Sequence, residues 1–217
     1  MKLLYGTGNM AKLGAMQRWL AGLDLEIVGL DAMKENVPQV TETGNTPLEN
    51  ARQKALAYYG AFGLPVFSCD SGLYFEGVPN DVQPGVHVRT INGKYLTDNE
   101  MLLYYGNLAK KYGPLKARYQ NAICLVLDEE HIFESIDSSL GGEPFLITSV
   151  PHSLVLHKGF PLDSLSIDLK TGKYFYDLEE RIRDEVAVGD GFVEFFRSAL
   201  CLPVENNTGK TPGKKMD

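Results

Sequence analysis

The chain has 217 residues, of which 44% are hydrophobic and 23% are charged, and its formal net charge is -7. This composition is that of an ordinary globular protein, and the length suits one large domain or two closely fused lobes. Broad nucleic-acid binding needs a cationic surface, which an acidic chain does not favour. No apolar run approaches the roughly 20 residues needed to span a bilayer, and the N-terminus does not resemble a signal peptide. We therefore expect a cytoplasmic protein without nucleic-acid or membrane partners.

The three cysteines, Cys69, Cys124 and Cys201, are far apart and form no Cys-x-x-Cys pair. This spacing favours buried free thiols over a zinc site or a disulfide framework. The four histidines also lack ligand spacing, so no metal role is assigned to them.

The first thirty residues predict a β-α-β unit. Residues 3–5 form a short apolar run that predicts a buried strand, 11–21 show helical spacing that ends at Gly22, and 25–30 predict a second strand. A β-α-β start implies a sheet with at least some parallel pairing.

Two later helices carry clear start signals. One is predicted from the Thr46 cap to about Phe62, and the other from Thr97 to Tyr112. In both, a glutamate follows the threonine cap by three residues, and in the first a proline occupies the first helical position.

The remaining segments complete an α/β pattern. They are, in order, a strand over 66–69 that delivers Asp70 at its end, a loop over 77–93, a hairpin of strands 115–127 and 131–136, a strand pair within 145–156, and a final helix over 190–200. Residues 203–217 are polar and aperiodic, so we expect a single domain over 1–202 followed by a disordered tail.

A glycine-rich turn joins the first strand to the first helix. Gly6, Thr7, Gly8 and Asn9 stand where a helix start aims free backbone N–H groups at an anion, and the glycines allow close approach. Thr7 and Asn9 add side-chain donors, and Lys12 adds a positive charge one turn later. The alternative is a turn without function. A Walker loop is excluded because no glycine-lysine pair follows at the required spacing.

Two carboxylates are candidates for chemistry. Glu42 lies in a polar loop and Asp70 precedes Ser71. Hard oxygen ligands from two segments can hold Mg²⁺, and one of them can orient or deprotonate an attacking water. The alternatives are a solvated loop charge for Glu42 and a turn cap for Asp70. Lys54 and Arg89 are candidate phosphate contacts, with an ordinary exposed lysine as the alternative for Lys54.

Five short motifs within residues 7–89 together resemble the inosine triphosphate pyrophosphatase family. They are Thr7-Gly8-Asn9-x-x-Lys12, Glu42-Thr43-Gly44, Glu49-Asn50-Ala51-x-x-Lys54-Ala55, Asp70-Ser71-Gly72-Leu73 and Pro84-Gly85-Val86. That family hydrolyses deaminated purine triphosphates such as ITP, dITP and XTP to a nucleoside monophosphate and pyrophosphate. The resemblance implies an elongated mixed α/β sheet with flanking helices, two lobes around a central cleft, Mg²⁺ as cofactor and, usually, a homodimer.

The resemblance also implies roles for individual residues. Glu42 and Asp70 would hold the metal, Asp70 would be the base for the attacking water, and Ser71 would help hold the substrate. The phosphate contacts would be Thr7, Gly8, Asn9, Lys12 and Lys54. Such a site agrees with the chemistry, because phosphoryl-group chemistry needs mainly positioning and charge neutralisation.

The second half of the chain resembles the family less closely. Residues 159–163 are similar to the family's base-reading segment, so that Phe160 would stack on a purine and Asp163 would hydrogen-bond its edge. Pro161 and Leu162 replace a glycine and an aromatic residue there. The alternative for this segment is a turn of the core.

Two departures from the family bear on specificity and on the metal. By the resemblance, Arg183 would replace the family's lysine as a substrate contact, but the histidine-arginine pair that follows it in the family is absent from 183–189. We therefore expect weaker selection of the purine keto group than the family shows. Cys69 replaces the first of the family's paired aspartates, which leaves the metal with one ligand fewer or with help from Glu76.

Three functions remain open at this point. The first is a Mg²⁺-dependent nucleoside-triphosphate pyrophosphatase that cleanses the nucleotide pool with an altered base preference. The second is a pyrophosphatase of the Maf type acting on other modified nucleotides. The third is a catalytically inactive nucleotide-binding protein.

Overall fold

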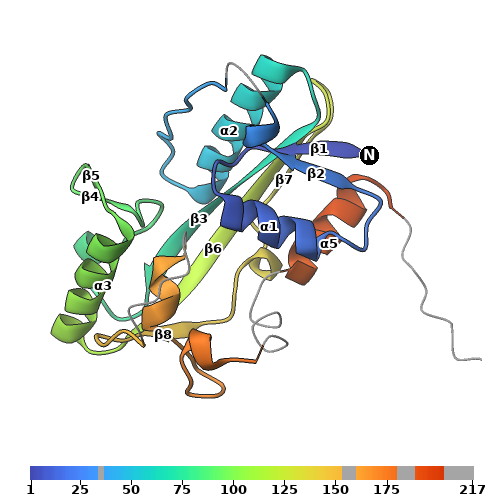
Figure 1. Cartoon of the computed structure of the whole chain (residues 1–217). Coiled ribbons are helices and arrows are strands. Elements are labelled where there is room, and N and C mark those ends of the chain that lie inside the picture. Colours follow the sequence, from blue (N-terminus) through green and yellow to red (C-terminus); the bar gives the residue numbers. More distant parts are fainter. Residues whose placement is uncertain (34–36, 153–159, 180–188, 203–217) are drawn as a thin grey trace, which may run out of the picture.

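The computed structural model describes residues 1–33, 37–152, 160–179 and 189–202. It confirms the α/β class: one mixed seven-stranded sheet is flanked by four helices in these ranges (Figure 1). None of the helices within them is long and apolar enough to cross a membrane.

The main sheet has the strand order β2-β1-β3-β6-β8-β9, with β7 also beside β6. Its strands are β1 (Lys2–Tyr5), β2 (Glu26–Gly29), β3 (Val66–Phe75), β6 (Leu115–Val126), β7 (Ile132–Ser135), β8 (Phe145–Ile147) and β9 (Ser166–Asp168). A separate hairpin joins β4 (Thr90–Ile91) to β5 (Lys94–Tyr95). The helices are α1 (Met10–Trp19), α2 (Pro47–Phe62), α3 (Asp98–Tyr112) and α5 (Gly189–Ala199), and the single turns used below are η3 (Ser138–Leu140) and η4 (Pro161–Leu165).

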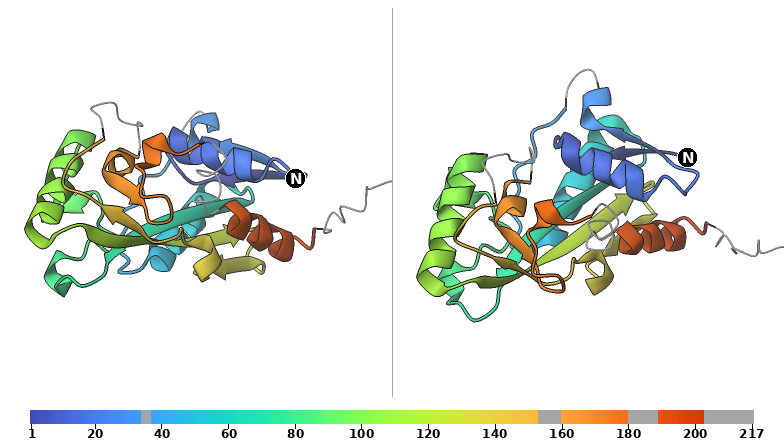
Figure 2. Two further views of the ribbon diagram at one scale, coloured as in Figure 1. Left: turned by 90° about the horizontal axis from the view of Figure 1, so that it is seen from below. Right: turned by 60° about the horizontal axis from the view of Figure 1, so that its bottom comes forward.

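A long antiparallel ribbon of β3 and β6 runs through the whole molecule. At one end β1 pairs with β3 in parallel, at Val66 and Phe67 only, and β7 lies along β6. At the other end β8 takes the place of β7 beside β6. Helices α1, α2 and α5 surround the first end and α3 the second, which makes the molecule elongated (Figure 2). The expected β-α-β start with parallel pairing is confirmed, because β1 is parallel to both β2 and β3.

The two faces of the ribbon bury different helices, as the period of two along a strand requires. Ala122, Cys124 and Val126 of β6 pack with α2, whereas Ile123 and Leu125 pack with α1 and α5. A third cluster joins α3 to the far end of the ribbon and to β8.

The predicted helix starts are confirmed in detail. The Thr46 hydroxyl accepts a hydrogen bond from the Glu49 amide at 3.3 Å, and the Glu49 carboxylate accepts from the Thr46 amide at 3.3 Å. Thr97 and Glu100 form the same reciprocal cap on α3. Gly63 then ends α2 with a left-handed φ of 62°. These caps fix the position of α2, and therefore of the side chains that its second and third turns present to β3.

Some sequence predictions are wrong. The strand that begins at Val66 does not end before Asp70 but continues to Phe75, because β6 pairs with it along its whole length. Of the strand pair expected within 145–156, β8 is present and pairs with β6 and β9, while residues 153–156 lie outside the described residues. Cys201 is exposed rather than buried. The expected tail over 203–217 and the substrate contact of Arg183 lie outside the described residues.

Candidate active site

The predicted site residues gather where β1 stops and β3 continues. β1 ends at Tyr5, opposite Phe67, so the edge of β3 beyond Phe67 is left for the loop that leads into α1. Asp70 lies in this stretch, in the middle of a strand and not at its end. The N-terminus of α1, the loop before α2 and the middle of β3 meet at this place.

Side chains of the opening loop cap α1 from within. The Asn9 side-chain oxygen accepts hydrogen bonds from the amides of Ala11, at 2.9 Å, and Lys12, at 3.3 Å. The Thr7 hydroxyl accepts from the Asn9 amide at 3.2 Å. The loop therefore offers fewer free donors than the sequence predicts, because three amides are already occupied. Among the described residues, the amides of Gly8 and Met10 have no such partner, and they remain for an anion.

Gly6 sits against α2 and β3, with no room for a side chain. A Cβ added there would lie 2.2 Å from the Ser68 hydroxyl oxygen and 2.6 Å from the Tyr58 ring, whereas nothing lies within 4 Å of a Cβ added at Gly8. Only the first glycine is thus required by packing.

Gly6→Ala is expected to lower the free energy of unfolding by about 1–3 kcal/mol, because overpacking forces neighbouring side chains from their preferred rotamers. Gly8→Ala is the matched control in the same loop and should leave the free energy of unfolding nearly unchanged. Urea unfolding followed by circular dichroism measures both. Equal stability losses in the two variants would show that the packing around Gly6 is not what the glycine serves.

One lysine joins the two predicted metal carboxylates. The Lys54 Nζ lies 2.9 Å from Asp70 Oδ1 and 3.1 Å from Glu42 Oε1. The Lys54 and Asp70 side chains are only 12% and 11% exposed, whereas that of Glu42 is 43% exposed. The structure therefore brings together three residues that are separated by up to 28 positions in the chain.

Burial and neighbouring charges shift the pKa values of the two lysines of the site in opposite directions. Burial alone would lower the pKa of Lys54, but the carboxylates of Asp70 and Glu42 outweigh it and the pKa is raised. Burial and the nearby Lys54 charge lower the pKa of Lys12, which the same carboxylates only partly offset. Lys12 is thus within electrostatic reach of the Lys54, Asp70 and Glu42 group.

Cys69 contributes a neutral group to this surrounding. Burial raises the pKa of the Cys69 thiol to about 12, and the thiol interacts with the Tyr5 hydroxyl. It therefore supplies no negative charge beside Asp70. Glu76 does not replace it: six residues beyond Asp70 on a strand correspond to roughly 20 Å, and Glu76 pairs with Lys116 at 2.9 Å.

The two carboxylates fit the divalent metal that the resemblance implies. Glu42 and Asp70 both reach one ammonium group, so one cation can be near both. Mg²⁺ is commonly held by one or two carboxylates, with water and phosphate oxygens completing its shell. The described residues contain no group of three or more His, Cys, Asp or Glu side chains that could hold a metal.

Asn50 is a site residue to which the sequence analysis gave no role. It is 2% exposed, and its side-chain amide donates to Asp70 Oδ2 at 3.1 Å. Its side-chain oxygen accepts from the Gly44 amide at 2.8 Å. Its place in the Glu49-Asn50-Ala51 motif, one helical turn before Lys54, was the signal available in the sequence.

The proposed base-reading residues lie with α3 and η4. Phe160 is half-buried and caps η4, and burial raises the pKa of Asp163 to about 7. The Tyr119 hydroxyl interacts electrostatically with both Asp163 and Arg89. Arg89 donates to Asp98 at 2.7 Å and to the Leu96 carbonyl oxygen at 3.2 Å. A phosphate contact by Arg89 would therefore require this ion pair to open, and it stays a prediction, as does substrate binding by Ser71, Phe160 and Asp163.

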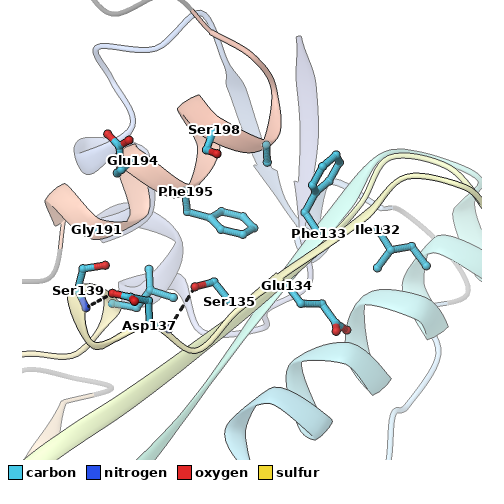
Figure 3. Close-up of a pocket in the computed structure, with 12 residues that line it drawn as sticks. Ile132, Phe133, Glu134, Ser135, Asp137, Ser139, Gly191, Glu194, Phe195 and Ser198 are labelled. Atoms are coloured by element: carbon cyan, nitrogen blue, oxygen red, sulfur yellow. Dashed lines mark hydrogen bonds between the residues drawn. The ribbon is translucent and has the colours of Figure 1, made fainter.

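A cavity of about 620 Å³ lies elsewhere, between β7, η3 and α5. Figure 3 shows the Phe195 and Phe133 side chains at it, with Glu194 and Asp137 among its polar residues. None of the predicted site residues that the structure describes lines it, so it is separate from the Asp70 site.

Comparisons with known sequences found relatives of this chain. A family model described as the Ham1 family matches residues 3–143. Proteins named dITP/XTP pyrophosphatase are similar: that of Deinococcus deserti is 34% identical over 60% of this chain, that of Porphyromonas gingivalis 34% over 65%, and that of Thermus thermophilus 31% over 84%. The matches span 60%, 73% and 84% of these relatives' own lengths.

Solved structures share the fold. A HAM1 protein from Coxiella burnetii superposes with a TM-score of 0.73 at 22% identity, covering 94% of this chain and all of that one (100%). The Ham1 protein of Staphylococcus aureus gives a TM-score of 0.69 at 18% identity, covering 92% of this chain and 98% of that one. Since the family model also matches well over half of the sequence, the chain belongs to the Ham1 family.

Proposed function

We propose that this protein hydrolyses deaminated purine nucleoside triphosphates, of the ITP, dITP and XTP type, to the nucleoside monophosphate and pyrophosphate. The observation that carries the proposal is the convergence of Glu42, Lys54 and Asp70 beside the N-terminus of α1. The relatives named dITP/XTP pyrophosphatase support the substrate class. A Mg²⁺ cofactor, a homodimer and a cytoplasmic location belong to the same proposal.

The residues suggest how the phosphates are held. Donors and positive charge for the phosphates come from the free amides of Gly8 and Met10 and from the ammonium groups of Lys12 and Lys54. Because the chain as a whole is acidic, with a net charge of -7, this charge has to be local. When bound between Glu42 and Asp70, Mg²⁺ would neutralise charge on the phosphate oxygens.

In this proposal Asp70 activates the attacking water. The water oxygen forms a bond to the α-phosphorus, the bond from that phosphorus to the oxygen that bridges to the β-phosphate breaks, and pyrophosphate leaves. Asp70 accepts the proton of the water. Its Oδ1 is held by Lys54 in the free protein, so phosphates that draw the Lys54 ammonium away would release this oxygen for the water.

The test is a panel of triphosphates assayed for pyrophosphate release with Mg²⁺. We expect turnover of dITP and XTP, but a dITP preference over dATP in kcat/KM below roughly 10³-fold, because fewer donors read the keto group. A larger preference would contradict the weakened selectivity. Turnover of modified pyrimidine or methylated triphosphates in place of dITP would favour a Maf-type activity, and no turnover of any triphosphate by the folded protein would exclude the enzyme.

A further inference from the structure

Asn50 bonds both to Asp70 and to the backbone of the loop that carries Glu42, whereas Lys54 reaches that loop through the Glu42 side chain. Asn50 donates to Asp70 Oδ2 at 3.1 Å and accepts from the Gly44 amide at 2.8 Å. Lys54, one turn further along α2, takes the other oxygen, Asp70 Oδ1, at 2.9 Å. Each Asp70 oxygen is therefore held by a different donor of the same helix face.

The orientation of the Asn50 amide follows from its partners. A carboxylate oxygen can only accept and a backbone N–H can only donate, so the NH₂ group must face Asp70 and the oxygen must face Gly44. Both partners are satisfied in a position that is 2% exposed. In such a buried place, a lost donor or acceptor costs more than at the surface.

The space around this contact is closed. A Cβ added at Gly44 would lie 2.6 Å from the Asn50 side-chain oxygen and 2.6 Å from the Glu49 Cβ. The backbone of the loop therefore approaches α2 as closely as only a glycine allows. This close approach fixes the position of Gly44, two residues after Glu42, beside Glu49 and Asn50 of α2.

A second residue of α2 holds the same loop without contacting Asp70. Gln53 accepts from the Thr43 amide at 3.0 Å and donates to the Thr43 hydroxyl at 3.1 Å. Loop anchoring is thus shared between Gln53 and Asn50, whereas among these two only Asn50 reaches the carboxylate. Variants of Gln53 and Asn50 can therefore distinguish the anchoring of the loop from the contact with Asp70.

We propose that Asn50 is a positioning residue that sets the orientation of the Asp70 carboxylate and couples it to the Glu42 loop. By holding Oδ2, Asn50 turns Oδ1 toward Lys54 and Glu42, the side on which the attacking water and the substrate phosphates would bind. By holding Gly44, Asn50 keeps the Glu42 carboxylate close to Asp70 Oδ1. The role in turnover rests on the proposed pyrophosphatase function.

Asn50→Asp tests the contact with little change of shape. A carboxylate at position 50 still accepts from the Gly44 amide but cannot donate to Asp70, so only one of the two bonds is lost. We expect kcat for dITP to fall about 10²-fold, the effect of a misplacement of about 1 Å, with KM for the nucleotide little changed. Asn50→Ser, neutral and smaller, should lower kcat similarly and serves if the first variant does not fold.

Gln53→Ala is the matched control, since it loosens the loop but leaves the Asp70 bond. It should raise the Mg²⁺ concentration for half-maximal rate, and at saturating Mg²⁺ lower kcat far less than Asn50→Asp does. Equal losses of kcat in the two variants would reduce Asn50 to a loop anchor and overturn the proposal. An Asn50→Asp enzyme with wild-type kcat would overturn it as well.

A stability measurement tests the same bond without any turnover. Asn50→Asp should lower the urea midpoint, because two carboxylates then face each other. The double variant Asn50→Asp/Asp70→Asn exchanges donor and acceptor, so its midpoint should recover while its kcat stays low. No recovery would show that the bond does not couple the two residues. Inactive wild type with a normal recovery would refute the pyrophosphatase function but leave the contact established.

Discussion

Asp70→Asn is expected to lower kcat for dITP by about 10²–10⁴-fold, the range that a positioned general base contributes. The amide keeps the shape of the carboxylate but cannot accept the proton of the attacking water. Triphosphate binding should survive, because the amides of Gly8 and Met10 and the Lys12 ammonium remain. Steady-state pyrophosphate release measures the first effect, and calorimetry with a non-hydrolysable triphosphate measures the second.

Asp168→Asn is the control for the loss of a buried carboxylate. Asp168 is 3% exposed and accepts hydrogen bonds from the Thr171 amide at 2.8 Å and hydroxyl at 2.7 Å, on β9 and away from the site. Its variant should lose stability but keep kcat. Near-normal turnover by Asp70→Asn would reject Asp70 as the base. Tight triphosphate binding by an equally inactive wild type would favour the nucleotide-binding protein instead.

Lys54→Met should destabilise the metal-free protein by about 3–5 kcal/mol, since removal of one partner leaves a buried charge uncompensated. The Lys54 and Asp70 side chains are 12% and 11% exposed, so water screens this pair little. Mg²⁺ should restore part of the loss by taking the place of the ammonium charge between Asp70 and Glu42. Urea unfolding with and without Mg²⁺ gives both quantities.

The pH dependence of that loss has a definite sign. Because the pKa of Lys54 is raised in the folded state, its contribution is fully present below the ordinary lysine pKa of about 10.4. It disappears only as the pH rises through the raised value. The difference between wild type and Lys54→Met should therefore stay constant from neutral pH to about pH 9 on the lysine's account.

Lys116→Met is the matched surface control. Lys116 pairs with Glu76 at 2.9 Å, but these side chains are 45% and 64% exposed. Exposed pairs contribute about 0–1 kcal/mol, so this variant should change stability little and show no response to Mg²⁺. Equal losses for Lys54→Met and Lys116→Met would mean that the Lys54 pair is no stronger than a surface pair.

Local signals predicted the parts of the molecule that local forces determine. The span of α2 follows from Thr46, Pro47 and Gly63, because caps and breakers act within one turn. The same holds for α3, and the glycine turn before α1 was found because its pattern is continuous in the sequence. A shared site of Glu42 and Asp70 was a hypothesis from their residue types, and the family resemblance added Lys54 to it, since the three residues lie on separate segments.

The wrong or missing predictions concern partners distant in sequence. β3 passes through Asp70 because β6, about fifty residues later, supplies its hydrogen bonds, and a Ser-Gly pair alone suggests a turn. Asn50 bonds to residues 6 and 20 positions away, so no spacing rule of a helix finds both. The Asn9 oxygen caps α1, as is typical of asparagine at a helix start, and this cap does not use the side-chain NH₂ group, so substrate binding by Asn9 stays a prediction.

The ribbon of β3 and β6 also sets the separation between the Asp70 site and the residues proposed to read the base. Asp70 pairs with Ala122, and Tyr119, beside Asp163 and Arg89, pairs with Leu73. These two ladder positions are three residues apart, roughly 10 Å along the strand, and by the period of two their side chains leave opposite faces of the ribbon. That spacing is set by backbone registration within one sheet and not by the placement of two independent domains. A change in it would require every pair in the ladder to slip, so this ladder would hold the two proposed subsites at a fixed separation.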